Sequence, residues 1–312
     1  MRVAVTGASG FIGCNLVREF KNNGWDVASL VEGSDVVSDC DHGVFPVEIM
    51  SGNGLMKAFS GADVVIHLAA RNHIPKDKAE NPLAEYRLVN VEGTRNVLQS
   101  AMRSGAKIFI HISSVKAMGE GSDGIQNEDS PNVPGTSYGV SKLESEEVVR
   151  NESSGSGMSA VILRLPMVYG PGNKGNLPRM IRWANRGLPF PIFGFDNLRS
   201  MIYVGNVIHG ILLAVRNAVP GVTTYVVTDG EEYSTRRVYA AICRELGKAP
   251  RFLPVPDWMV RLGGLLSEDV RRVTGSFRVS SEKIRNELGY SPPYSLEQGI
   301  AETVQWYKRS AR

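Results

Sequence analysis

The chain has 312 residues, of which 42% are hydrophobic and 21% are charged, and its formal net charge is +3. A chain of this length can bury a large core, and the composition is that of a soluble globular protein rather than a disordered or membrane-embedded one. The small positive charge is dispersed and includes no long basic run, which argues against a nucleic-acid partner.

Cysteine usage and the N-terminal residues both favour a reducing compartment. The three cysteines lie far apart and form no C-x-x-C pair or histidine cluster, so we expect neither a disulfide framework nor a metal site. Met1 and Arg2 lead directly into an apolar strand, and the longest apolar run, GILLAV, is too short to span a bilayer. We therefore expect a cytoplasmic protein with no membrane partner.

Apolar runs rich in β-formers alternate with helical patterns over the first half of the chain. Helices are predicted over residues 11–23, 83–104 and 137–153, and buried parallel strands are predicted at RVAVTG, DVASLV, DVVIHLA, KIFIHIS and SAVILRL. This alternation predicts an α/β fold with a doubly wound parallel sheet over residues 1–165. Prolines and turn formers then become frequent, which predicts a smaller α/β lobe over residues 166–312, with some segments returning to the first unit.

The stretch VTGASGFIG joins the first predicted strand to the first predicted helix. Gly7, Gly10 and Gly13 allow a tight turn, a close approach of phosphate to the backbone, and close packing of helix on strand. The helix that begins at Phe11 and Ile12 offers N–H groups to a pyrophosphate. In this position the motif predicts a dinucleotide site of the Rossmann type.

Glu32 follows Gly13 by about 20 residues, near the end of the second predicted strand. An acid at this distance commonly binds the ribose hydroxyls, and its charge would repel a 2′-phosphate. This favours NAD over NADP. An exposed loop glutamate is the alternative interpretation, so NADP stays open.

Tyr138 and Lys142 are spaced i, i+4 in the helical stretch TSYGVSKLE, which places the phenol and the ammonium on one helix face. A free tyrosine has a pKa of about 10. A neighbouring ammonium and a nicotinamide cation would stabilise the phenolate, so that Tyr138 could act as a base near neutral pH. Downstream of a dinucleotide loop, this pair predicts an acid–base site.

Seven stretches carry this pattern along the chain: TGASGFIG, HLAA, NVEGTRNVL, ISSVKAMGE, SYGVSK, LRLPMVYGPG and RSMIYVGNV. Together they resemble the extended short-chain dehydrogenase/reductase family, and within it the NAD-dependent nucleotide-sugar 4-epimerases and 4-ketoreductases. The resemblance implies a Rossmann fold, bound NAD, a nucleotide-sugar substrate such as a UDP-hexose, and a homodimer.

The resemblance also implies roles for individual residues. Ser114 would bond the sugar 4-oxygen, Tyr138 would exchange the proton, and Lys142 would hold the nicotinamide ribose. Further cofactor contacts are implied for Glu48, Ile49, Leu68, Ala69, Ala70, Asn90 and Pro166. Glu48 stands where the family usually carries Asp. Substrate contacts are implied for Asn176, Leu177 and Arg199, with Arg71, Arg271 and Arg272 as weaker candidates.

Three functions are compatible with this pattern. The leading one is 4-epimerisation of UDP-glucose and UDP-galactose, or of their N-acetyl forms, through a transient 4-keto sugar. The second is one-way reduction of a UDP-4-keto-6-deoxy sugar, which the sequence leaves open. The third, a silent dinucleotide-binding regulator, is opposed by the presence of Ser114, Tyr138 and Lys142 together. A 4,6-dehydratase is disfavoured because Val115 and Lys116 occupy the places of its Asp-Glu pair.

Overall fold

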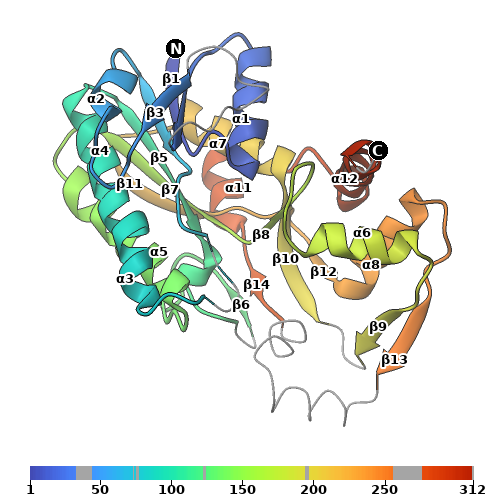
Figure 1. Ribbon diagram of the computed structural model, residues 1–312. Coiled ribbons are helices and arrows are strands. Elements are labelled where there is room, and N and C mark those ends of the chain that lie inside the picture. The colour runs from blue at the N-terminus through green and yellow to red at the C-terminus, as the bar shows by residue number, and fades with distance from the viewer. Residues whose placement is uncertain are drawn as a thin grey trace.

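The computed structural model describes residues 1–32, 44–72, 74, 77–121, 124–193, 197–255 and 276–310. The chain forms a larger lobe built on a central sheet and a smaller lobe beside it (Figure 1). The central sheet has seven parallel strands in the order β11-β7-β5-β4-β1-β2-β3. These strands are β1 (Arg2–Thr6), β2 (Asp26–Glu32), β3 (Val44–Val47), β4 (Val64–His67), β5 (Ile108–Ser114), β7 (Ser159–Leu165) and β11 (Gly221–Val226).

Helices cover both faces of the central sheet, because side chains that alternate along each strand are apolar on both sides. On β1, Val3 and Val5 belong to the core that includes Leu16 of α1, whereas Ala4 belongs to the core on the opposite face. The helices of this lobe are α1 (Phe11–Asn22), α2 (Leu55–Ala58), α3 (Pro82–Arg87), α4 (Gly93–Arg103), α5 (Ser137–Ser153), α7 (Val204–Arg216) and α11 (Glu282–Leu288). The predicted doubly wound α/β fold is confirmed.

In its described part, the smaller lobe contains short sheets and three helices. A three-stranded sheet has the order β12-β10-β8, and β13 pairs with β9. Its elements are β8 (Met167–Tyr169), β9 (Phe190–Phe193), β10 (Leu198–Tyr203), β12 (Glu232–Ser234), β13 (Phe252–Val255), α6 (Asn176–Asn185), α8 (Thr235–Glu245) and α12 (Leu296–Ser310). A separate two-stranded sheet joins β14 (Arg278–Val279) to β6 (Ile125–Gln126). Among the described residues, no helix combines the length and the apolar composition needed to cross a bilayer.

The structure differs from the sequence-based expectation in three elements. The helix predicted over residues 83–104 is interrupted by a π-helical turn, Leu88–Glu92, which lies between α3 and α4. The short strand β3 was not predicted, because Pro46 interrupts its pattern. The strand β11 was not predicted either, since its Thr223 and Thr224 make the run look polar, yet it pairs with β7.

Candidate functional site

The glycine loop leaves no room for side chains between β1, α1 and the segment after β4. Gly7 has a φ of +68°, and a Cβ there would lie 2.8 Å from the nitrogen of Ala69. A Cβ on Gly13 would lie 2.2 Å from the carbonyl oxygen of Gly7. Gly10 caps α1 without a side-chain hydrogen bond, so the N–H groups of the first turn at Phe11 have no capping side chain. This bare, close-packed turn fits the pyrophosphate of a dinucleotide.

Two acids lie at the ends of adjacent strands beside this loop. Glu32 is the exposed last residue of β2 and is paired in register with Val47 of β3. Glu48 directly follows β3, and its carboxylate accepts a hydrogen bond of 2.8 Å from the Ser51 hydroxyl. Both side chains are therefore at the carboxyl edge of the sheet, where the adenosine half of a dinucleotide binds in doubly wound folds.

The remaining segments implied for the cofactor also end at this edge. The backbone N–H groups of Leu68 and Ala69 donate to the carbonyl oxygen and the hydroxyl of Thr6, at 3.2 and 3.3 Å. This ties the segment Leu68–Ala70 to the end of β1. Ile49 packs against Gly93 of α4, where an added Cβ would lie 3.0 Å from its Cδ1. Pro166 is buried directly after β7.

Asn90 lies in the π-helical turn and is only 1% exposed. Its side-chain oxygen accepts the N–H of Arg71 at 2.8 Å, and its amide donates to the Arg71 carbonyl at 3.1 Å. The same amide donates to Ser141 Oγ at 2.9 Å, and Ser141 Oγ donates to the Tyr138 carbonyl at 2.8 Å. Asn90 therefore connects the segment after β4 to the turn of α5 that carries Tyr138. The π turn supplies the extra residue that points this side chain inward.

Ser114, Tyr138 and Lys142 are brought together by β5 and α5. Ser114 is the last residue of β5, and its hydroxyl hydrogen-bonds with Tyr138. Thr136 caps α5 by accepting the N–H of Gly139 at 3.1 Å, which fixes where the helix begins. The ring of Tyr86 lies edge-on to that of Tyr138, with 6.0 Å between the centroids.

The two titratable groups of this set are both perturbed by burial. Burial raises the pKa of Tyr138 to about 12, while the hydrogen bond with Ser114 acts in the opposite direction. Burial lowers the pKa of Lys142 to about 8. Lys142 is 2% exposed, and its Nζ donates to the carbonyl oxygen of Ile112 at 2.8 Å. The chain's own groups therefore do not produce the lowered tyrosine pKa expected from the sequence, because desolvation of the phenolate outweighs the other effects.

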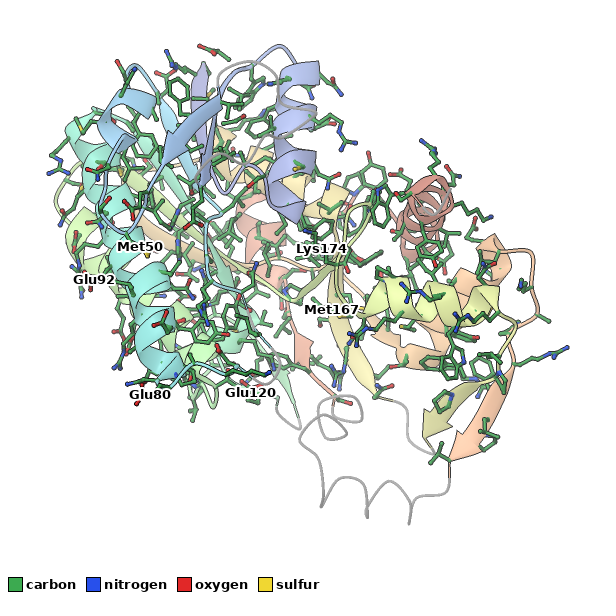
Figure 2. All side chains as sticks on the ribbon, viewed as in Figure 1. Met50, Glu80, Glu92, Glu120, Met167 and Lys174 are labelled. Carbon is green, nitrogen blue, oxygen red and sulfur yellow. The ribbon has the colours of Figure 1, made fainter. Side chains whose placement is uncertain are left out.

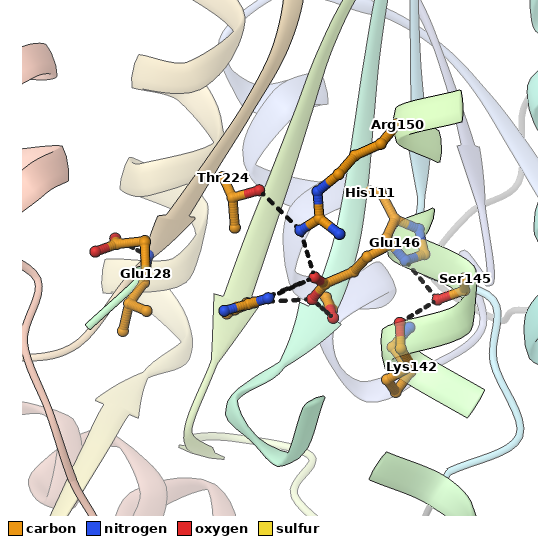
Figure 3. Close-up of polar contacts among 10 residues, drawn as sticks. His111, Glu128, Lys142, Ser145, Glu146, Arg150 and Thr224 are labelled. Atoms are coloured by element: carbon orange, nitrogen blue, oxygen red, sulfur yellow. Dashed lines mark hydrogen bonds and ion pairs between the residues drawn. The ribbon is translucent and has the colours of Figure 1, made fainter. Parts of the chain in front are cut away.

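A buried ionic network lies behind Lys142 on the same helix (Figure 3). Glu146 is fully buried, and its carboxylate accepts hydrogen bonds from Ser113 at 2.6 Å, from Arg164 at 2.7 Å and from Arg150 at 2.8 Å. Arg150 also donates to Thr224 Oγ1 of β11 at 3.3 Å. One carboxylate thus joins α5 to β5 and β7, and through Arg150 to β11.

Sequence reasoning did not single out this network. The available signal was Arg164 within the otherwise apolar run SAVILRL, because a buried arginine requires an acidic partner. That partner, Glu146, is one of four acids in α5, and the sequence does not distinguish it from the others.

Two histidines at the centre of the sheet are structural. His67 Nδ1 lies 2.7 Å from Thr6 Oγ1, and His111 Nε2 lies 3.0 Å from Ser145 Oγ. Burial, reinforced by the charge of Lys142, lowers the pKa of His67 to about 3 and lowers that of His111 as well. Both rings are therefore neutral at physiological pH. No group of three metal-binding side chains occurs in the described part of the chain, and His73 lies outside it.

The smaller lobe has a cavity of about 90 Å³ that brings together three of the predicted substrate residues. Asn176 and Leu177 begin α6, and Arg199 reaches the cavity from β10, with Met167 and Tyr233 completing the wall. Burial lowers the pKa of Arg199. Figure 2 places Met167 near the boundary between the two lobes, so the cavity lies beside the larger lobe.

The other arginine candidates are placed differently. Arg71 is engaged by Asp77, whose carboxylate accepts from its Nη2 at 3.0 Å, and its guanidinium lies 5.3 Å from the centre of the Tyr86 ring. The hydrogen bond to Asp77 raises the pKa of Arg71. Arg71 therefore already has a partner of its own. Arg271 and Arg272 lie outside the described residues.

Comparison with known proteins identifies the family to which the chain is similar. Residues 3–228 match the family model for the NAD dependent epimerase/dehydratase family. A UDP-glucose 4-epimerase of Vibrio cholerae is 34% identical over an alignment of 312 positions, which covers 97% of this chain and 94% of the relative. The N-acetyl-alpha-D-glucosaminyl-diphospho-ditrans,octacis-undecaprenol 4-epimerase of Escherichia coli O157:H7 is 28% identical, with 97% and 94% coverage.

A solved structure also resembles this chain over nearly its whole length. The UDP-glucose 4-epimerase of Thermus thermophilus, in complex with NAD, is 27% identical and superposes with a TM-score of 0.79, with 99% of each chain covered. The glycine cradle described above fits the same cofactor. The prediction of NAD is confirmed, and the chain belongs to the NAD-dependent epimerase/dehydratase family.

Proposed function

We propose that this protein is a 4-epimerase of UDP-hexoses that interconverts UDP-glucose and UDP-galactose, or their N-acetyl forms. The observation that carries the proposal is the assembly of Ser114, Tyr138 and Lys142 at the carboxyl edge of the sheet. The cavity with Arg199 in the smaller lobe supports a diphosphate-linked substrate, since arginine offers fork-shaped donors to phosphate. The relative from Vibrio cholerae is named as a UDP-glucose 4-epimerase, which also supports the proposal.

In this mechanism Tyr138 moves the proton of the substrate. Its phenolic oxygen accepts the proton of the sugar 4-hydroxyl and later returns it to the epimeric 4-oxygen. Ser114, already hydrogen-bonded with Tyr138, holds the 4-oxygen in line with the phenol. The substrate passes through a 4-keto sugar. This intermediate turns over in the site before the hydride is returned to its opposite face. One acid–base residue serves both directions, so no further proton donor is required.

Lys142 orients the cofactor rather than the substrate. Its Nζ is fixed by the Ile112 carbonyl, which leaves further N–H donors for the ribose hydroxyls of the nicotinamide half. When bound, NAD⁺ would supply the hydride acceptor and a positive charge that favours the phenolate. The hydrogen bonds of Asn90, made through Ser141, hold the turn that carries Tyr138 in a fixed position relative to the segment after β4.

Dehydration of the sugar is disfavoured by the two residues after Ser114. Val115 is buried, and Lys116 pairs with Glu120 at 2.5 Å while its Nζ lies 5.1 Å from the ring centre of Phe277. Neither position offers the acid and base that elimination of water requires. Reduction of a UDP-4-keto-6-deoxy sugar uses the same three residues and is therefore the second candidate.

We also propose a division of labour between the two units expected from the sequence. Residues 1–165 would bind NAD, residues 166–312 would bind the sugar nucleotide, and β11 would return to complete the first sheet. The expected homodimer stays a prediction, which light scattering of the purified protein would test.

The deciding experiment is to incubate the purified protein with each UDP-hexose and UDP-N-acetylhexosamine and to follow the 4-epimer by proton NMR. We expect one pair to interconvert to a constant ratio from either side, without net consumption of nicotinamide. The Tyr138→Phe variant is the matched control. Failure to epimerise any of them, together with NADPH-dependent reduction of a UDP-4-keto-6-deoxy sugar, would replace the epimerase with the reductase.

A further inference from the structure

The smaller lobe presents a strongly basic surface around the C-terminal half of α6. Residues 153–195 contain no Asp or Glu. Arg179 and Arg182 of α6 and its C-cap Arg186 recur at i, i+3 and i+7, the spacing of one helix face. Lys248 donates to the Asn185 carbonyl, which brings the segment after α8 against the end of α6. The α6 face, as we call it, consists of the exposed residues Arg179, Arg182, Trp183, Arg186, Leu188, Lys248, Arg251 and Leu253.

The positive charges of the α6 face are not neutralised within the described part of the chain. None of the ion pairs there involves a basic residue of this face. On the larger lobe, by contrast, Arg87 pairs with Glu144 and Arg95 with Glu152. The basic side chains of α6 therefore face solvent as a positive field available to an anionic partner.

Large apolar side chains are exposed within the same surface. Trp183 is 42% exposed and Leu188 39%, and Leu253 is 55% exposed on β13, which pairs with the strand β9 that follows α6. The indole N–H of Trp183 already donates to the Pro189 carbonyl at 3.0 Å, so the exposed part of the ring is apolar. A basic face interrupted by tryptophan and leucine has the character of surfaces that bind at the headgroup level of membranes.

Contrary to the sequence-based expectation of no membrane partner, we infer that the α6 face docks this protein onto an anionic lipid bilayer. Lysine and arginine supply attraction to anionic headgroups, at about fivefold in affinity for each residue near the surface, and Trp183 and the leucines enter the interface. The face is less suited to a nucleic acid, because it offers one aromatic side chain and no aromatic series on which successive bases could stack. Since α6 begins at the substrate cavity, docking along α6 brings that cavity close to the membrane surface.

The test is cosedimentation of the full-length protein with vesicles of phosphatidylcholine alone and with vesicles that also contain phosphatidylglycerol. We expect binding to the anionic vesicles only, weakening as NaCl is raised. The double variant R182E/R186E should bind at least about 25-fold more weakly, from the loss of two basic residues. The control K57E/K107E makes the same change of net charge with two exposed lysines of the larger lobe and should bind like the wild type.

Two further measurements keep the outcome decisive. Trp183→Ala should weaken vesicle binding while preserving its salt dependence, because it removes only the apolar contribution. Circular dichroism and turnover of a soluble substrate confirm that the R182E/R186E variant is folded. Equal vesicle binding by R182E/R186E and K57E/K107E, or no binding by the wild type, overturns the proposal. Salt-dependent binding of a single-stranded RNA by the α6 face, with no binding to vesicles, would assign the face to nucleic acid instead.

Discussion

Glu146 and Arg164 form an ion pair in the core, with 2.7 Å between Oε2 and Nη2 and neither side chain more than 1% exposed. Glu146 follows Lys142 by one helical turn and Tyr138 by two, and Arg164 lies next to the last residue of β7. The pair therefore fixes the helix that carries the proposed acid–base residue against the sheet. The contribution of this pair to the free energy of unfolding can be measured separately from its effect on catalysis.

Replacing Glu146 with glutamine should lower the free energy of unfolding by about 3–5 kcal/mol, because the charge of Arg164 stays buried without its partner. Chemical denaturation of the wild type and the variant measures this difference. Glu231→Gln is the matched control, since Glu231 pairs with Arg237 at the exposed surface and should matter little. A similar small effect at both positions would contradict a structural role for the buried pair.

The same pair predicts a pH dependence of stability. Burial alone would raise the pKa of Glu146, but hydrogen bonds and charge from Arg164, helped by Ser113 and Arg150, lower it overall. A lowered folded-state pKa gives stability that is present above the unfolded value of about 4.3 and is lost as the pH falls through the folded value. The stability difference between wild type and Glu146→Gln should therefore shrink below about pH 4. A difference independent of pH would mean that folding does not lower the pKa of Glu146.

Lys142 should produce a slope of the same sign in the alkaline range, because its pKa is also lowered on folding. Its folded-state pKa of about 8 lies below the unfolded value of 10.5, so the unfolded chain binds more protons between these two values. Stability of the wild type relative to Lys142→Met should rise across this interval, by at most about 1.4 kcal/mol per pH unit. Denaturation at several pH values between 7 and 11 checks this. Parallel curves would mean that folding does not lower the pKa of Lys142.

Tyr138→Phe should lower turnover by at least about 10²-fold, the usual scale for a positioned acid–base group. The fold and the affinity for NAD should be retained, since the aromatic ring and its contact with Tyr86 remain. Steady-state kinetics and NAD titration together separate the two effects. Near-normal turnover on the true substrate would remove Tyr138 from this role.

Glu32→Ala should weaken the preference for NAD over NADP. A unit charge about 4 Å from the 2′-phosphate contributes ~1 kcal/mol in water, so we expect a shift of about fivefold or more in the ratio of affinities. Glu19→Ala, on the solvent side of α1, is the control. A wild type that already prefers NADPH would show that Glu32 does not contact the ribose, and would favour the reductase.

Arg199→Ala should weaken the affinity for UDP itself by about tenfold to a hundredfold, because a charge-assisted hydrogen bond of roughly 1.5–3 kcal/mol is lost. The effect should appear in KM more than in kcat, since ground state and transition state share the diphosphate. Calorimetry with UDP measures it, with Arg103→Ala of α4 as the control. Unchanged affinity would mean that the diphosphate does not bind in the cavity of the smaller lobe.

The parts of the site that the sequence could predict are those with fixed spacing. Gly7, Gly10 and Gly13 follow from the turn they must form, and the i, i+4 separation of Tyr138 and Lys142 places both on one helix face. The buried ionic contacts depend on tertiary neighbours instead. Glu146 meets Arg164 only because α5 packs across β7, and Arg71 is engaged by Asp77 through a loop whose path no local pattern specifies.

The strand β11 has a consequence for synthesis of the chain on the ribosome. The edge strand β7 ends at Leu165, but its parallel neighbour begins only at Gly221, after β8, α6, β9, β10 and α7 have been made. At ~5–20 residues per second the nascent sheet waits several seconds with one hydrogen-bonding edge open. During that interval the polypeptide is exposed to edge-to-edge aggregation, so delays in translation between Leu165 and Gly221 should lower the soluble yield. Synonymous rare codons placed in this stretch, compared with the same codons after β11, would reveal the dependence.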